Sequence, residues 1–220
     1  MPKPKAAFVA VLLFFLLTIG GIGFYYWYQN AHYVTTEDAY VDGPMWRLGP
    51  SVAGKIASIP VKEGDQVEPG QEILRLDNRS LPPGADPDLA IVRSPVKGIV
   101  LKVSARPGEV VGAGQPVVLV GDPRQFYITA NVDESKIWRV HPGQRVVVRI
   151  DALPGRVFEG RIAEINTAVA STFSLIPTRS TSGSFVKVSQ RVPVKIYLLD
   201  AKGADLRLGE SAEVKIFARE

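Results

Sequence analysis

A stretch of this chain is repeated, without a gap, 44 positions later, and no other feature constrains the fold as strongly. The first copy runs from Ser51 to Asp77, and each copy has short apolar segments interrupted by glycine turns. Self-similarity at a fixed offset indicates one structural unit used twice. The matched positions are Gly54 and Gly98, Gly64 and Gly108, Asp65 and Glu109, Val67 and Val111, Gly70-Gln71 and Gly114-Gln115, Ile73-Leu74 and Val117-Val118, and Leu76 and Val120.

The first thirty residues predict a membrane-spanning helix. No charged residue occurs from Ala6 to Asn30, and the apolar part is long enough to cross a hydrocarbon core of roughly 30 Å at about 1.5 Å per residue. A cleaved signal peptide is the competing interpretation. However, the apolar run exceeds the usual ~7–15 residues and ends in bulky rings, Phe24–Tyr28, rather than in a small-residue cleavage site. We therefore expect an uncleaved helix over residues 6–30, with those rings in the interfacial aromatic belt.

The basic residues predict which way the helix crosses. Lys3 and Lys5 precede it, and no further Lys or Arg occurs before Arg47. Because short cytoplasmic segments are enriched in Lys and Arg, residues 1–5 are expected in the cytoplasm and Tyr33–Glu220 on the far side, which is the periplasm of a Gram-negative cell. The chain is expected to be a single-pass protein of the inner (plasma) membrane.

Composition excludes several kinds of chemistry. The 220 residues include no cysteine and only two histidines, His32 and His141, so disulfides and thiolate nucleophiles are excluded and no metal site is expected. The net charge of +4 comes without a basic cluster interleaved with aromatics, so nucleic acid is not an expected partner. No Ser/His/Asp order, H-E-x-x-H or P-loop occurs, and no catalytic residue is predicted.

The chain after the repeat has the pattern of a small β-barrel. Asp133 is a suitable N-cap for a short helix. Trp46 and Trp138 are expected to be packing residues. Glu37 and Asp38 are adjacent, and we weigh a functional carboxylate pair against a solvated strand end, the second being favoured because adjacent strand residues point to opposite faces. Strands are predicted at Phe126–Val132, Arg145–Ile150, Val157–Ile165, Val192–Leu199 and Ala212–Ala218, and the helix at Glu134–Val140.

These features together resemble the HlyD-type membrane fusion proteins, also called periplasmic adaptor subunits. T-E-D-A-Y-V-D-G at Thr36–Gly43 looks like that family's first strand after the anchor, and the two repeats look like its split lipoyl/biotinyl half-motifs. The stretch Ile128–Ile162 looks like its barrel. F-S-L-I-P-T-R-S-T-S-G-S-F-V-K-V-S-Q-R-V-P-V-K-I at Phe173–Ile196 is similar to the Emr-type branch, whose members pair with major-facilitator drug exporters.

The resemblance implies a mainly β fold of several modules. It places a split lipoyl-like β-sandwich at 51–122, a β-barrel at 123–185 with a long loop at 167–185, and a membrane-proximal β module at 34–50 plus 186–220, in which the chain's start pairs with its end. The function implied is that of an adaptor for an inner-membrane exporter of small molecules or drugs, with several copies forming a collar. An outer-membrane channel stays open as a further partner.

The chain departs from the family pattern between the lipoyl halves. Most members carry an α-helical hairpin there, whereas this chain has only the short insert 78–93, with Pro82, Pro83, Gly84 and Pro87. Two helices do not fit, because one helical turn uses ~3.6 residues and prolines break the rest. The usual contact with an outer-membrane duct is therefore not predicted from this insert.

A lipoyl or biotin cofactor is not expected. A carrier domain presents a lysine at the turn joining its halves, and the insert has none, while Lys97 and Lys102 lie in the second copy. Two alternatives to the adaptor stay open: a membrane-anchored protein that tethers or assembles envelope components without transport, and a lipoyl or biotin carrier domain.

One apolar cluster in the long loop is the candidate contact with a partner or substrate. Apolar side chains on a polar segment tend to mark interfaces. The alternative is that they cap the barrel's core. The cluster is Phe173, Ser174, Leu175, Ile176 and Pro177.

Overall fold

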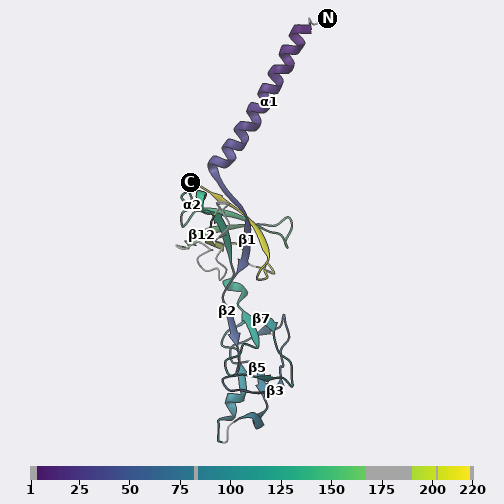
Figure 1. Cartoon of the computed structure of the whole chain (residues 1–220), viewed down its shortest axis with the longest axis vertical. Coiled ribbons are helices and arrows are strands. Elements are labelled where there is room, and N and C mark those ends of the chain that lie inside the picture. Colours follow the sequence, from purple (N-terminus) through teal and green to yellow (C-terminus); the bar gives the residue numbers. More distant parts are fainter. Residues whose placement is uncertain (1–3, 82–83, 167–189, 202, 219–220) are drawn as a thin grey trace, which may run out of the picture. The chain divides into compact units, whose positions relative to one another are not determined.

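The computed structural model describes residues 4–81, 84–166, 190–201 and 203–218, and it divides into two compact units. We call them the barrel unit and the sandwich unit, and describe each by itself (Figure 1). The barrel unit consists of Met1–Tyr40, Ile128–Ala204 and Glu210–Glu220, and the sandwich unit of Val41–Tyr127 and Asp205–Gly209.

The barrel unit begins with one long apolar helix. Helix α1, Pro4–His32, has 29 residues and contains the predicted span 6–30. Its 21-residue stretch Leu12–His32 is apolar enough to cross a membrane, and none of that stretch is buried against protein. A helix that is apolar on all sides yet uncovered needs a non-aqueous environment. The rings of Phe24–Tyr28 are exposed, as an aromatic belt at a lipid interface requires.

Six strands form a closed barrel in the order β1-β10-β13-β12-β11-β14. Side chains alternate between buried and exposed along β11, β13 and β14, so one face of each strand fills the interior. Between β10 and β11 the short helix α2, Glu134–Ile137, is capped by Asp133, as predicted, but it ends three residues early. The strands are β1 Tyr33–Asp42, β10 Tyr127–Asp133, β11 Arg145–Ile150, β12 Val157–Ile165, β13 Arg191–Leu198 and β14 Ser211–Phe217.

The barrel differs from the expected division into a barrel at 123–185 and a separate membrane-proximal module. The pairing of the two chain ends is confirmed, since Tyr33 to Thr36 pair with Phe217 to Val214. Yet β13 lies between β10 and β12, and β14 between β11 and β1. β10, β11 and β12 alone would leave open edges, and the strands from the chain ends remove those edges by closing the sheet. The two expected modules are therefore one barrel.

The sandwich unit has two four-stranded sheets, with the orders β2-β9-β7-β4 and β6-β5-β3-β8. The repeat offset maps β3 on β7, β4 on β8 and β5 on β9. Each copy, however, gives its short middle strand to the sheet of the other copy. The strands are β2 Met45–Leu48, β3 Gly54–Ser58, β4 Gln66–Val67, β5 Glu72–Leu76, β6 Ile91–Arg93, β7 Gly98–Val103, β8 Val110–Val111 and β9 Val118–Gly121.

This exchange of strands has the same register in both directions. Val67 pairs with Gly98, and the equivalent residue Val111 pairs with Gly54. The turns before these strands match as well. The Gly64 N–H donates to the Val100 carbonyl at 2.8 Å, and the Gly108 N–H donates to the Ile56 carbonyl at 2.8 Å. The unit is therefore a two-fold repeat in its hydrogen bonds and not only in its sequence.

The core of the sandwich repeats in the same way. Most of its fully buried side chains are Val, Ile or Leu, each contributing roughly 1.5–3 kcal/mol by leaving water. The buried pairs related by the offset are Ile56 and Val100, Val67 and Val111, Ile73 and Val117, Leu74 and Val118, and Leu76 and Val120.

The repeat extends further towards the N-terminus than its sequence indicates. Leu48 of β2 pairs with Val118, and the equivalent residue Val92 of β6 pairs with Leu74. Residues 45–48 thus belong to the sandwich, although we expected 34–50 to lie in a membrane-proximal module. Likewise, the end of the insert 78–93 is a strand of the repeat. Its other described residues form the short 3-10 helices η1, Asn78–Ser80, and η2, Pro87–Ala90, so no helical hairpin occurs among them.

The turn glycines provide a test of this unit. Gly108 has a φ of +95° with nothing within 4 Å of an added Cβ, so Gly108→Ala introduces backbone strain alone. We expect it to lower the free energy of unfolding of the sandwich unit by about 1–2 kcal/mol. Denaturant unfolding in detergent, followed by Trp46 fluorescence with Trp27→Phe and Trp138→Phe, measures the change.

Gly112→Ala in the same turn region is the matched control. Its φ is not positive, and an added Cβ would meet only the Gln115 Oε1 at 3.7 Å, an ordinary contact. We expect a change within about 0.5 kcal/mol. Equal losses for the two variants would contradict the assignment of the strain to the positive φ.

Candidate functional site

The predicted contact residues Phe173–Pro177 lie outside the described residues. Only the strands that flank them are described. The chain leaves β12 at Ile165 and re-enters β13 at Arg191, and both residues are at the end of the barrel where β1 begins. Just before β13, the Gln190 carbonyl accepts a hydrogen bond from the Glu134 N–H of α2 at 2.9 Å.

A polar pocket lies on the barrel wall next to this re-entry point. Its volume is about 630 Å³, and side chains of β1, β10, α2, β13 and β14 line it. Carboxylates and cations face the same space, so the pocket suits a polar or charged group rather than an apolar one. The lining residues are Thr35, Thr36, Glu37, Asp38, Asn131, Asp133, Lys136, Arg191 and Glu213.

Asp38 links three strands at the wall of this pocket. One carboxylate oxygen accepts from the Asn131 Nδ2 of β10 at 3.1 Å, and the other is paired with the Arg191 guanidinium of β13. A break in the β1–β14 register between Thr36 and Ala39 accompanies this arrangement. The Thr36 hydroxyl donates to the Asn131 carbonyl at 2.8 Å and accepts from the Asp38 N–H at 3.2 Å. We call these four residues, Thr36, Asp38, Asn131 and Arg191, the Asp38 cluster.

The cluster changes the interpretation of the Glu37-Asp38 pair. Asp38 is not a freely solvated strand end, since its carboxylate joins β1 to β10 and β13. Glu37 is exposed and lines the same pocket as Asp38, because the irregular register between Thr36 and Ala39 interrupts the alternation of faces. No local signal identified the partner, because Arg191 lies 153 positions away.

The pocket has no arrangement suited to catalysis among the described residues. The Thr36 hydroxyl is occupied by backbone partners, and no histidine lines the wall. No group of three or more His, Asp or Glu side chains in the described chain could hold a metal ion. Recognition by charge and hydrogen bonding is what the described geometry supports.

A second pocket, in the sandwich unit, is apolar. Its volume is about 530 Å³, and it lies between the segment 205–208 and the start of β7. A side chain at position 43 would disturb this region, because its Cβ would lie 2.5 Å from the ring of Phe126, which lines the pocket. The lining includes Met45, Ile99, Leu101, Phe126, Leu206 and Leu208.

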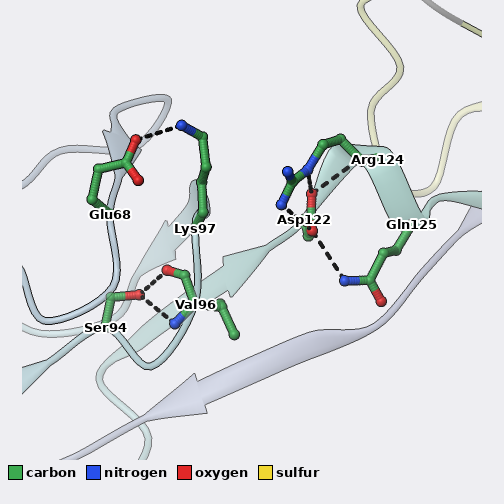
Figure 2. Close-up of polar contacts among 7 residues, drawn as sticks. All are labelled: Glu68, Ser94, Val96, Lys97, Asp122, Arg124 and Gln125. Carbon is green, nitrogen blue, oxygen red and sulfur yellow. Dashed lines mark hydrogen bonds and ion pairs between the residues drawn. The ribbon is translucent and has the colours of Figure 1, made fainter.

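Lys97, the lysine nearest the junction of the halves, forms an ion pair. Its Nζ lies 2.6 Å from the Glu68 Oε1, and both side chains are more than half exposed (Figure 2). The turn before it is fixed by the Ser94 hydroxyl, which donates to the Val96 carbonyl at 2.7 Å. A surface ion pair of this kind contributes only about 0–1 kcal/mol. The geometry therefore gives Lys97 an ion-pair partner on the neighbouring turn.

Asp122 lies directly after β9, the last strand of the sandwich in sequence, and before the 3-10 helix η3, Pro123–Gln125. It caps this helix, and the residue is 4% exposed. Figure 2 shows its carboxylate accepting from the Arg124 guanidinium at 2.9 and 3.0 Å and from the Gln125 amide at 3.0 Å. The side-chain hydrogen bonds from Arg124, with those of Gln125 and the Arg124 N–H, lower the pKa of Asp122 to about 2 against the opposing effect of burial.

Comparison with known domain families also divides the chain into a sandwich part and a barrel part. Residues 50–121 match the barrel-sandwich hybrid domain of YknX, and residues 125–217 match the AAEA-like beta-barrel domain. The first match covers the two repeat copies. The second covers β10 to β14.

Two relatives show the range of similarity. The chain is 34% identical over 188 residues to YhbJ of Bacillus subtilis (strain 168), a protein assigned to an efflux system, covering 86% of this chain and 81% of YhbJ. It is 31% identical over 127 residues to the multidrug export protein EmrA of Escherichia coli (strain K12), covering 56% of this chain and 32% of EmrA. The chain thus spans most of YhbJ but about a third of EmrA.

Solved structures share the fold at low identity. The periplasmic adaptor protein EmrA superposes with a TM-score of 0.57 at 16% identity, covering 84% of this chain and 98% of that one. MacA from Actinobacillus actinomycetemcomitans gives a TM-score of 0.63 at 14% identity, covering 84% and 81%. At these identities the likeness shows the fold alone.

The Asp38 cluster predicts that one carboxylate contributes to barrel stability and its neighbour does not. Asp38→Ala removes the links to Asn131 and Arg191, and we expect it to lower the free energy of unfolding of the barrel unit by about 1–2 kcal/mol, since the site is partly exposed. Glu37→Ala is the control and should change it by less than about 0.5 kcal/mol. Thermal or denaturant unfolding in detergent measures both. A larger loss for Glu37→Ala would contradict the cluster's role.

The low pKa of Asp122 predicts a pH dependence. A carboxylate whose folded pKa lies below its unfolded value stabilises the fold above about pH 4, and this contribution is lost as pH falls towards the folded pKa of about 2. The contribution at neutral pH is at most about 2 kcal/mol. Asp122→Asn keeps a good N-cap but loses the charge, so it should be less stable at pH 7.

The measurement is the difference in unfolding free energy between the native chain and Asp122→Asn, taken from pH 7 to pH 2. We expect the difference to shrink as pH falls below about 4. A difference that is the same at both ends of the range would show that the carboxylate charge is not involved.

Proposed function

Because the chain belongs to the family of membrane fusion proteins, the periplasmic adaptor subunits, we propose that it is the adaptor of an inner-membrane exporter. The observation that carries this proposal is the match to YhbJ, which spans both the sandwich and the barrel and most of the relative's length. The match to the multidrug export protein EmrA supports the same proposal over a shorter stretch of the chain.

The work of such an adaptor is mechanical rather than chemical. Helix α1 would hold the chain in the membrane beside the exporter. Lys3 and Lys5 favour an orientation with residues 1–5 in the cytoplasm and the body outside. The barrel and the sandwich would act as preformed bodies, since strands distant in sequence close the barrel and complete both sheets of the sandwich. Several copies side by side would form a collar that receives the substrate.

The partner and substrate are proposed from the relatives. The Emr-type resemblance favours an exporter of the major-facilitator type, and small molecules or drugs as its cargo. A contact with an outer-membrane channel is not supported by a helical hairpin, because the described residues between β5 and β7 form only η1, η2 and β6. If a channel takes part, the turns of the sandwich would make that contact.

The cluster Phe173–Pro177 is the proposed contact with exporter or substrate. Support comes from its flanks: the chain re-enters the barrel at Arg191, on the wall of the polar pocket, next to α2. The cluster is apolar within a polar segment, and the pocket beside its flank is polar.

An export assay tests the role of the cluster. Alanine at Phe173, Leu175 and Ile176 removes the apolar side chains, and we expect loss of most drug resistance or dye efflux in cells that depend on this chain and its exporter. Alanine at Thr178, Ser180 and Thr181 in the same segment is the matched control and should leave export near normal. Membrane fractions and thermal unfolding confirm that both variants insert and fold. Normal export by the first variant would refute the contact.

A further inference from the structure

Trp138 is the most exposed large ring of the described barrel. It follows α2 directly and was expected to pack, yet the residue is 73% exposed. Its indole N–H is already satisfied by the Ser135 carbonyl at 3.0 Å, so the ring is fixed by its own turn and not by a core. An ordered tryptophan with its apolar ring outside the fold indicates a surface that something apolar covers.

Arg139, the next residue, ties this turn to the membrane-spanning helix. Its Nη1 donates to the Asn30 carbonyl at 2.8 Å, and its Nη2 donates to the Ala31 carbonyl. The last carbonyls of a helix lack intrahelical partners and form the negative end of its dipole, so a guanidinium is well suited to bind them. The turn itself is braced by Gln144, whose Nε2 donates to the Arg139 carbonyl at 3.1 Å. Trp138 is therefore held at the level of the last turn of α1.

That level corresponds to the lipid headgroups. The aromatic belt of α1 ends at Tyr28, and Ala31 is three residues further on, which is only about 4–5 Å along a helix axis. Headgroup layers are about 5–8 Å thick on each side of the hydrocarbon core. A ring held at Asn30 and Ala31 thus lies within the layer that tryptophan prefers.

Cations gather at the same end of the barrel. Lys215 of β14 lies 3.7 Å from the centre of the Tyr33 ring, with its Nζ 3.3 Å from the Gln29 Oε1 of α1. Arg145, the first residue of β11, lies over the Phe217 ring at 5.0 Å. Tyr33 and Phe217 are half-buried, and basic side chains next to such rings suit a surface in contact with anionic lipid.

We propose that the end of the barrel where β1 begins sits in the lipid headgroup layer, with Trp138 as its anchor and Arg139 as the residue that positions it. The proposal rests on the part of the proposed function in which α1 spans a membrane. It does not depend on the side of the membrane, the exporter or the substrate. The barrel is then held by two membrane contacts, the helix and Trp138, instead of by the helix alone.

The chain's three tryptophans make this measurable by fluorescence. The full chain is reconstituted in nanodiscs of phosphatidylethanolamine and phosphatidylglycerol, with and without lipids that carry a spin-label quencher near the headgroup. Trp27→Phe with Trp46→Phe leaves Trp138 as the only tryptophan, whose emission is excited at 295 nm, roughly where tyrosine no longer absorbs. Trp46→Phe with Trp138→Phe leaves Trp27, which reports on α1. A background without native tryptophan but with Val157→Trp places a ring at the opposite end of the barrel, where Val157 is 53% exposed.

We expect the quencher to reduce Trp138 emission at least twofold, comparably to Trp27, and to leave the ring at 157 nearly unquenched. Arg139→Gln in the Trp138-only chain should bring the quenching down towards the value at 157, because the link to α1 is lost. The same substitution in the Trp27-only chain should leave Trp27 quenching unchanged. Quenching of Trp138 no greater than at 157 would overturn the proposal. If Trp27 also fails to be quenched, the membrane anchor of the proposed function fails with it, and the two failures are thereby distinguished.

Discussion

The exchange of short strands between the two repeat copies is the constraint on which the sandwich depends. β4 of the first copy completes the sheet of the second, and β8 of the second completes the sheet of the first, in equivalent registers. Neither copy can form its sheet alone, so the two must fold together. The residues that repeat are turn glycines and core side chains, which are the residues that such an exchange requires. The repeated glutamines also have a structural part, since the Gln71 and Gln115 Oε1 atoms accept from the Glu68 and Gly112 N–H groups at 2.9 Å.

A comparable constraint shapes the barrel. Its closure needs β1 and β14, which come from opposite ends of the chain, so the strand that follows the membrane helix is built into the wall. Asp38 then fixes that strand to β10 and β13. The strand that follows α1 is therefore bonded to neighbours on both of its edges.

The sequence predicted many of the elements but not their assembly. The repeat predicted the sandwich, and alternation predicted β11 and β12 with their observed bounds, because period-2 burial is a local property. The placement of β13 between β10 and β12 was not predictable, since strand neighbours depend on closure and not on local pattern. For the same reason β2 was assigned to the wrong module: its four residues are too few to show the offset.

The candidate site was predictable only in part. The Asp38 cluster joins residues up to 153 positions apart, and a single sequence has no signal at that separation. Trp138 was expected to pack because large rings are usually buried, and its exposure follows from the fixed turn after α2. The apolar cluster Phe173–Pro177 lies outside the described residues, so its role stays a prediction.

The adaptor assignment is tested most directly by purifying the full chain from its native membranes in a gentle detergent and identifying what comes with it by mass spectrometry. Partner identity is read without any assumption about substrate. We expect an inner-membrane exporter and further copies of this chain in the same particle. Recovery with envelope enzymes or assembly factors and without any transporter would contradict the account, and so would an intact mass showing a lipoyl or biotin group on a lysine.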